Sequence, residues 1–369
     1  MTKKLLCALL AAATLPAAAP AQTVTLADVF DRAPIAGASV ISSNGLIIGV
    51  TDKDGRIDAA EKDFPLSIRN LGYEALTVPS WSTDTLFMTA VTYSLPEIVV
   101  SAAARPVTRV LTYAREYCTG ATTADTMQLF SEYMLEYFFA EGKVKGYSKS
   151  DKSAHTLAVR RYGRIARNDG RDSVMRPTAD DEIAVLSFIE PMVFMPYDTK
   201  ELTEAMKNGA PADTIPGKYY PKTICRLNKD LFTLDCDALA DYENHAFEPW
   251  FFKMLGLTME MRKASWALAY KRNESGKYDL RDFISGSYSL HVLGKGRLIK
   301  KIIGVKDTIA INCYIEQYPV EIERLTPQEY KELTKTRRDR SETFREPAAV
   351  QPLPPSLQAM IERIDREVP

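Results

Sequence analysis

The sequence predicts an all-β N-terminal Greek-key β-sandwich followed by an α+β domain with a large antiparallel sheet. Residues 22–101 contain short apolar runs of strand length, each closed by Gly, Asn or Asp at a turn. Beyond residue 150 the strand-like segments become longer, with hairpin turn signals between some of them. The 369 residues are enough for two or three domains.

Composition sets few constraints on the class of protein. Hydrophobic residues make up 46% of the chain and charged residues 26%, which is typical of a globular protein. The formal net charge is −1, so the sequence does not predict a nucleic-acid partner.

Residues 1–21 have the three parts of a secretory signal peptide. Lys3 and Lys4 are followed by an apolar run at residues 5–15 and by small residues before a predicted cut after Ala21. No later window reaches about 18 apolar residues, so no transmembrane span is predicted in the mature chain. We expect an exported protein, either periplasmic or associated with the outer membrane.

The predicted sandwich occupies residues 22–101. A turn at residues 52–55 joins strands at residues 47–50 and 56–57. Asp52 and Asp54 are interpreted as turn residues, and the alternative is that they are calcium ligands. The runs at residues 34–40, 49–57, 66–74 and 95–100 resemble the carboxypeptidase-regulatory-like (transthyretin-like) domains of envelope proteins in the Bacteroidetes. Ile57 and Arg69 depart from that pattern, in which the matching positions are usually aromatic or small. The resemblance implies a sandwich domain and an envelope compartment.

The next segments are predicted to be a linker at residues 102–121 and an α+β domain at residues 122–340. A helix from residue 122 to about residue 139 is predicted by the three- and four-residue spacing of its large apolar side chains, which are Met127, Phe130, Met134, Tyr137 and Phe138. Strands are predicted at residues 156–161, 223–227, 232–236, 258–270, 285–293, 298–305 and 308–317. Residues 191–221 are predicted to be a surface excursion.

Residues 341–369 are predicted to be a proline-rich segment and a short amphipathic helix. Ser356 is the expected cap, and one face of the helix carries Leu357, Met360, Ile361, Ile364 and Val368. This face either docks on its own domain or is offered to a partner.

Four cysteines remain beyond the leader. Cys225 and Cys236 flank a turn at residues 228–230, so they could face each other across a hairpin and form a disulfide. The alternative is that they and the other two cysteines, Cys118 and Cys313, are all buried thiols.

The candidate metal-ligating residues are His245, Glu248 and His291. The first two have H-x-x-E spacing, and zinc carboxypeptidases bind their metal with such a pair plus a later His. The surrounding sequence lacks a strand-to-loop frame that would aim them at one ion, so we predict no catalytic, cofactor-binding or metal-binding residue. The basic string at residues 160–164 is interpreted as a solvated strand edge or a contact for an anionic lipid or glycan.

We therefore expect a non-enzymatic cell-envelope protein. Its sandwich domain would serve structure or protein contact, and its α+β domain would bind an envelope protein, a lipid or a glycan. One alternative is a zinc-dependent carboxypeptidase-like hydrolase. The other is a carrier of acyl chains, because a curved sheet clasped by helices is similar in element order to lipoprotein-carrier domains.

Overall fold

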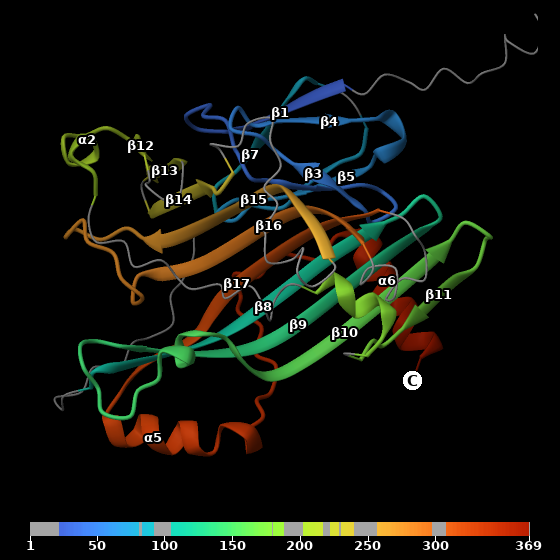
Figure 1. Cartoon of the computed structure of the whole chain (residues 1–369). Helices are drawn as coiled ribbons and strands as arrows, with labels where there is room; N and C mark the ends of the chain where they lie inside the picture. Colours follow the sequence, from blue (N-terminus) through green and yellow to red (C-terminus); the bar gives the residue numbers. More distant parts are fainter. Residues whose placement is uncertain are drawn as a thin grey trace, which may run out of the picture.

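The structure, a computed structural model, combines two small sheets near the N-terminus with one ten-stranded sheet (Figure 1). It describes residues 22–80, 83–91, 105–178, 180–187, 202–216, 222–228, 230–239, 257–296 and 308–368. The predicted leader, His245, Glu248 and the predicted strand at 298–305 lie outside the described residues.

Residues 22–91 form what we call the small domain. Its strands are β1 (Gln22–Asp28), β2 (Ser39–Ile41), β3 (Ile47–Val50), β4 (Arg56–Ala59), β5 (Leu66–Arg69), β6 (Leu76–Val78) and β7 (Thr85–Met88). They make a three-stranded sheet in the order β4-β1-β7 and a four-stranded sheet in the order β3-β2-β5-β6. Side chains from both sheets, including Leu26, Val40 and Ile68, share one buried cluster, so the two sheets pack face to face.

The large sheet confirms the prediction of a large antiparallel sheet. Its strands are β8 (Val107–Ala121), β9 (Asp125–Ala140), β10 (His155–Arg167), β11 (Asp172–Met175), β12 (Ala212–Pro216), β13 (Lys222–Leu227), β14 (Leu231–Asp237), β15 (Leu257–Lys271), β16 (Phe283–Gly296) and β17 (Ile309–Leu325). The order is β11-β10-β9-β8-β17-β16-β15-β14-β13-β12. Two antiparallel meanders, β8–β11 and β12–β17, therefore meet where β8 pairs with β17.

Two sequence-based predictions are wrong at the centre of this sheet. The predicted linker at residues 102–121 contains β8, and the predicted helix from residue 122 to about residue 139 is replaced by β9. In β9, Met127 and Tyr137 point to one face of the sheet, whereas Phe130 and Met134 point to the other. Because both faces are buried, apolar residues are not confined to alternate positions, and their spacing imitates a helix.

The other described predictions for this sheet are largely confirmed. Strands occur at the predicted positions in β10, β13, β14, β15, β16 and β17. In the predicted excursion at residues 191–221, the described part contains β12, which is an edge strand of the sheet.

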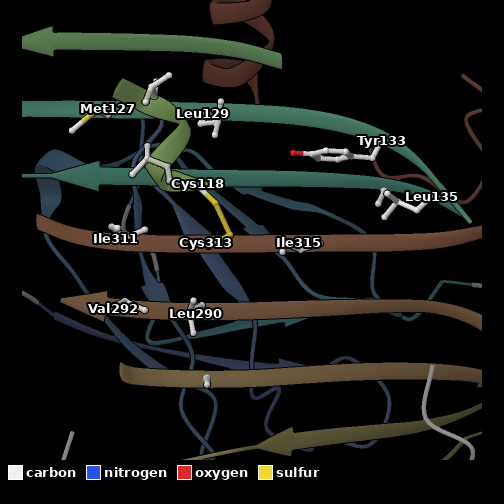
Figure 2. Packing of buried hydrophobic residues seen from close by; sticks show 14 of the residues in the cluster. Cys118, Met127, Leu129, Tyr133, Leu135, Leu290, Val292, Ile311, Cys313 and Ile315 are labelled. Carbon is white, nitrogen blue, oxygen red and sulfur yellow. A yellow bond between two sulfur atoms is a disulfide. The ribbon is translucent and has the colours of Figure 1, made fainter. Parts of the chain in front are cut away.

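The two faces of the large sheet are covered differently. One, which we call the domain face, packs against the small domain, residues 341–354 and α6 (Pro355–Glu367). The other, which we call the apolar face, carries a buried cluster that includes Leu129, Leu290 and Ile311 (Figure 2). Within the described residues, η3 (Glu182–Leu186) packs on this cluster through Ile183 and Leu186.

The helices are short and peripheral. The remaining ones are α2 (Glu204–Lys207), α5 (Pro327–Lys335), η1 (Glu61–Asp63), η2 (Lys149–Lys152) and η5 (Arg337–Asp339). The predicted C-terminal helix is confirmed as α6, although its N-cap is Pro354 and not Ser356. Its Leu357, Met360 and Ile364 are buried against the domain face, so the helix docks on its own chain. None of the helices in the described part of the chain has the length and apolar character needed to cross a bilayer.

Candidate binding groove and buried polar sites

A buried ion cluster joins the small domain to the large sheet. Arg69, at the end of β5, donates to both carboxylate oxygens of Glu316 on β17, at 3.1 and 3.2 Å. Arg115 on β8 lies 3.7 Å from the same carboxylate. All three side chains are less than 10% exposed. Because buried charges are costly unless they are paired, this cluster favours one relative position of the small domain and the sheet.

The C-terminal tail closes the same junction. Arg115 donates to the carbonyl oxygen of Gln351 at 2.8 Å, and Arg69 donates to the carbonyl oxygen of Pro352. The Gln351 amide in turn donates to the carbonyl oxygens of Asn70 and Tyr73 in the small domain. The tail therefore lies between the small domain and the sheet and is hydrogen-bonded to both.

Further contacts fix the small domain along the sheet. Lys263 on β15 donates to the carbonyl oxygens of Val50 and Thr51, at 2.7 and 2.9 Å. Tyr117 on β8 donates to the carbonyl oxygen of Gly45. Burial at this contact lowers the pKa of the Lys263 ammonium group.

A groove of about 640 Å³ opens beside this junction. One wall is formed by residues 67–69 of β5 and residues 74–77 at β6, with Val91 nearby, and the other wall is residues 348–355 of the tail. Ala75, Leu76 and Leu353 give the groove apolar surface, and the exposed Glu74 adds a charge. A volume of this size lies in the range of ligand sites, which are mostly apolar with a few polar groups.

Only one of the three candidate zinc ligands lies in the described part of the chain. His245 and Glu248 lie outside the described residues, and His291 lies on β16 beside Lys263 on β15. Nε2 of His291 is buried and has no hydrogen-bond partner among the described residues. Burial, with the nearby charges of Arg262 and Lys263, lowers the pKa of His291. The three-ligand group found among the described residues does not include it.

The disulfide does not join Cys225 and Cys236, the pair that the sequence suggests. Cys225 and Cys236 are free and buried, because the register of the β13–β14 hairpin places Cys225 opposite Leu234. Burial raises the pKa of the Cys225 thiol to about 12 and that of Cys236 to about 11. The disulfide joins Cys118 and Cys313, which lie directly opposite each other on β8 and β17 with Cα atoms 4.2 Å apart.

Asp52 serves the turn that the sequence predicts at residues 52–55. Its Oδ1 accepts from the backbone N–H groups of Asp54 and Arg56, at 2.9 and 2.8 Å. Neither Asp52 nor Asp54 belongs to a three-ligand group among the described residues.

The basic string at residues 160–164 lies on β10 and is largely paired. Arg160 lies 2.8 Å from Glu132, and Arg164 binds Asp172 with two hydrogen bonds of 2.9 Å. Two of the three arginines in this string are therefore paired with carboxylates of the same chain, which reduces the net positive charge of this strand.

Sequence reasoning missed a polar group inside the apolar face. Glu116 on β8 is fully buried, and its Oε2 accepts from the hydroxyls of Tyr133 and Ser187, at 2.9 and 2.8 Å. Its Oε1 lies 3.9 Å from the sulfur of Cys313. The only sequence signal is a lone Glu in a segment that was predicted to be linker, and this signal does not indicate burial.

Comparisons with known proteins leave the family open. No protein-family model and no curated protein match the chain. One solved structure, described as lipid–protein interactions in lipovitellin, aligns with 70% of this chain at 10% identity and a TM-score of 0.28. The aligned part is 28% of that structure's chain. A similarity at this level transfers neither the fold nor the binding property.

Proposed function

We propose that this chain is a non-enzymatic binding protein of the bacterial cell envelope that holds an extended segment of a partner protein. The observation that carries the proposal is the groove of about 640 Å³ between the small domain and the tail. Its wall includes β6, the last strand of its sheet among the described residues, so one edge of β6 faces away from β5. An extended peptide can add to such an edge by backbone hydrogen bonds and place alternate side chains in the adjacent groove.

The identity of the small domain is part of the proposal. The two packed sheets and the turn at residues 52–55 support a carboxypeptidase-regulatory-like sandwich with Greek-key connections at residues 22–101. The envelope location rests on the leader pattern at residues 1–21.

A partner in the groove would contact both the small domain and the C-terminal tail, and the junction holds these two walls in place. Arg69 and Gln351, which border the groove, are fixed by buried partners on the small domain and on the large sheet. A groove with rigid walls loses little conformational entropy when a peptide enters, which favours affinity.

An acyl-chain ligand is the alternative that the apolar face favours. Side chains of six strands form this face, including Leu129, Leu290 and Ile311, and their chemistry suits a lipid tail. These side chains already pack on one another and on η3, whereas the junction groove is hollow. We therefore assign the function to the groove and make lipid recovery an outcome of the test.

The test is a mild-detergent pull-down of the tagged chain from envelope fractions, with mass spectrometry of both proteins and lipids. Ala75→Trp would fill the groove from an exposed position. Ala212→Trp is the matched control, because Ala212 is an exposed alanine on β12, an edge strand of the other sheet. We expect one protein to be recovered with the wild type and with Ala212→Trp, and at least about tenfold less of it with Ala75→Trp.

Two results would overturn this assignment. Equal recovery by both variants would place the partner elsewhere, and recovery of a lipid without a protein would favour the acyl-chain carrier. The hydrolase alternative has its own signature, which is zinc that co-purifies and is lost on His245→Ala.

A further inference from the structure

We infer that Glu116, Cys118 and Cys313 form a zinc-binding site when the disulfide between the two cysteines is reduced. This site lies on the apolar face and is separate from the proposed groove. The ligand atoms of the three residues lie within 4.8 Å of one another, and all three residues are buried. Figure 2 shows the two sulfur atoms bridging β8 and β17 within the apolar cluster.

The backbone places the three ligands on one face. Cys118 and Cys313 are directly paired across β8 and β17, and Glu116 lies two residues before Cys118 on the same strand. Because strand side chains alternate between faces, Glu116 and Cys118 point the same way. Two adjacent inner strands of the large sheet, β8 and β17, therefore supply all three ligands.

Hydroxyl groups hold the carboxylate in a ligating orientation. Tyr133 on β9 and Ser187, which follows η3, both donate to Oε2 of Glu116. The other oxygen, Oε1, lies toward the sulfur of Cys313 at 3.9 Å. Metal-binding carboxylates are commonly oriented by such partners, and the loss of one lowers metal affinity.

The ligand chemistry favours zinc among common divalent cations. Two thiolates and one carboxylate match the sulfur and oxygen ligands that Zn²⁺ accepts, whereas Mg²⁺ and Ca²⁺ prefer oxygen ligands alone. At a Zn–S distance of about 2.3 Å, two tetrahedral sulfur ligands are separated by roughly 3.8 Å. Side-chain rotation at two paired strand positions can provide this separation once the sulfurs are no longer bonded.

The chemistry couples metal binding to the redox state. An external dithiol gives two electrons to the Cys118–Cys313 bond and becomes a disulfide, while the two cysteine sulfurs each take up a proton. Zinc binding then releases both thiol protons and leaves two thiolate ligands. The disulfide form has no thiolate to offer, so oxidation expels the metal.

The test measures zinc in the full-length chain after equilibrium dialysis against zinc salt, with and without a phosphine reductant. We expect about one zinc per chain in the reduced protein and none in the oxidised protein. Cys118→Ala should remove the zinc, and Glu116→Gln should weaken its binding about 10–100-fold. Cys225→Ala, Cys236→Ala and His245→Ala are controls that should retain it.

The inference is wrong if the reduced wild type binds no more zinc than Cys118→Ala, or if any of the control substitutions removes the metal. A second measurement avoids dependence on folding of the variants. Cobalt(II) added to the reduced wild type should give a thiolate-to-cobalt charge-transfer band that disappears on oxidation, and its absence would exclude thiolate ligation.

Discussion

The two faces of the large sheet are both buried, but by different chemistry. On β8, Tyr113, Arg115 and Tyr117 point to the domain face, whereas Ala114 and Cys118 point to the apolar face. The domain face carries charged groups because three parts of the chain meet there and supply partners for them. The apolar face is a hydrophobic core that contains a small polar group. One strand can therefore contribute to an ionic junction and to an apolar core through alternate residues.

The largest effect should come from breaking the ionic junction on the domain face. Glu316→Gln leaves Arg69 and Arg115 buried without the carboxylate, and removal of one partner of a buried pair costs about 3–5 kcal/mol. Urea unfolding should show this loss. Glu141→Gln is the control, because Glu141 pairs with Arg324 at the surface, where the loss should stay below about 1 kcal/mol. Equal losses for the two variants would contradict a buried ionic junction.

A cavity in the apolar face should have a comparable but more variable cost. Leu129 is fully buried on β9, so Leu129→Ala should lower the free energy of unfolding by about 2–5 kcal/mol. Val159→Ala on the neighbouring β10 removes an exposed side chain and should change it by less than about 0.5 kcal/mol. If Leu129→Ala costs as little as this control, the apolar face is not a packed core.

Reduction of the disulfide tests how far the apolar face depends on a covalent bond. Cys118 and Cys313 are 195 residues apart in sequence, and disulfides that close long loops typically contribute about 2–4 kcal/mol. Addition of dithiothreitol to the wild type should therefore lower the free energy of unfolding by this amount, seen as a lower urea concentration at the midpoint of unfolding. The same fall should occur in Cys225→Ala, because Cys225 is a free thiol. An unchanged midpoint would mean that the bond contributes no net stability to the fold.

The smallest effect should be a pH dependence of folding stability that comes from His291 on the domain face. The pKa of His291 is lowered in the folded chain by burial, Arg262 and Lys263, so the unfolded chain binds the proton first as pH falls. The contribution of His291 to stability is therefore complete above about pH 6.5 and decreases below it, toward the lower folded pKa. His291→Gln should flatten this slope when urea midpoints are compared between about pH 7.5 and about pH 5. An unchanged slope would mean that His291 does not titrate differently on folding.

The sequence was informative where turns and strand partners are local. The strands of the β13–β14 hairpin were predicted because a turn signal joins two apolar runs. The pairing of β8 with β17 was not predictable, because its register joins residues about 200 positions apart and no local signal encodes it. This pairing determines both the disulfide and the position of Glu116.

Arg69 shows the same limit for the groove. The sequence marked it only as a departure from the resembling family, and its role follows from Glu316 and Pro352, which are far away in the chain. The tail helix was predicted correctly from its spacing, but the path of residues 348–355 along the small domain was not. A groove formed by distant segments cannot be predicted from either segment alone.

The most direct test of the account is amide hydrogen exchange on the complex recovered from the envelope, compared with the free chain. The groove assignment predicts slower exchange at residues 74–78 and at the non-proline residues of 348–355, with no change at β12 on the edge of the large sheet. A second hollow, of about 610 Å³, lies beside α2 and is lined in part by Met206, Leu231 and Tyr278. Protection confined to this second hollow, or to the apolar face, would contradict the groove assignment.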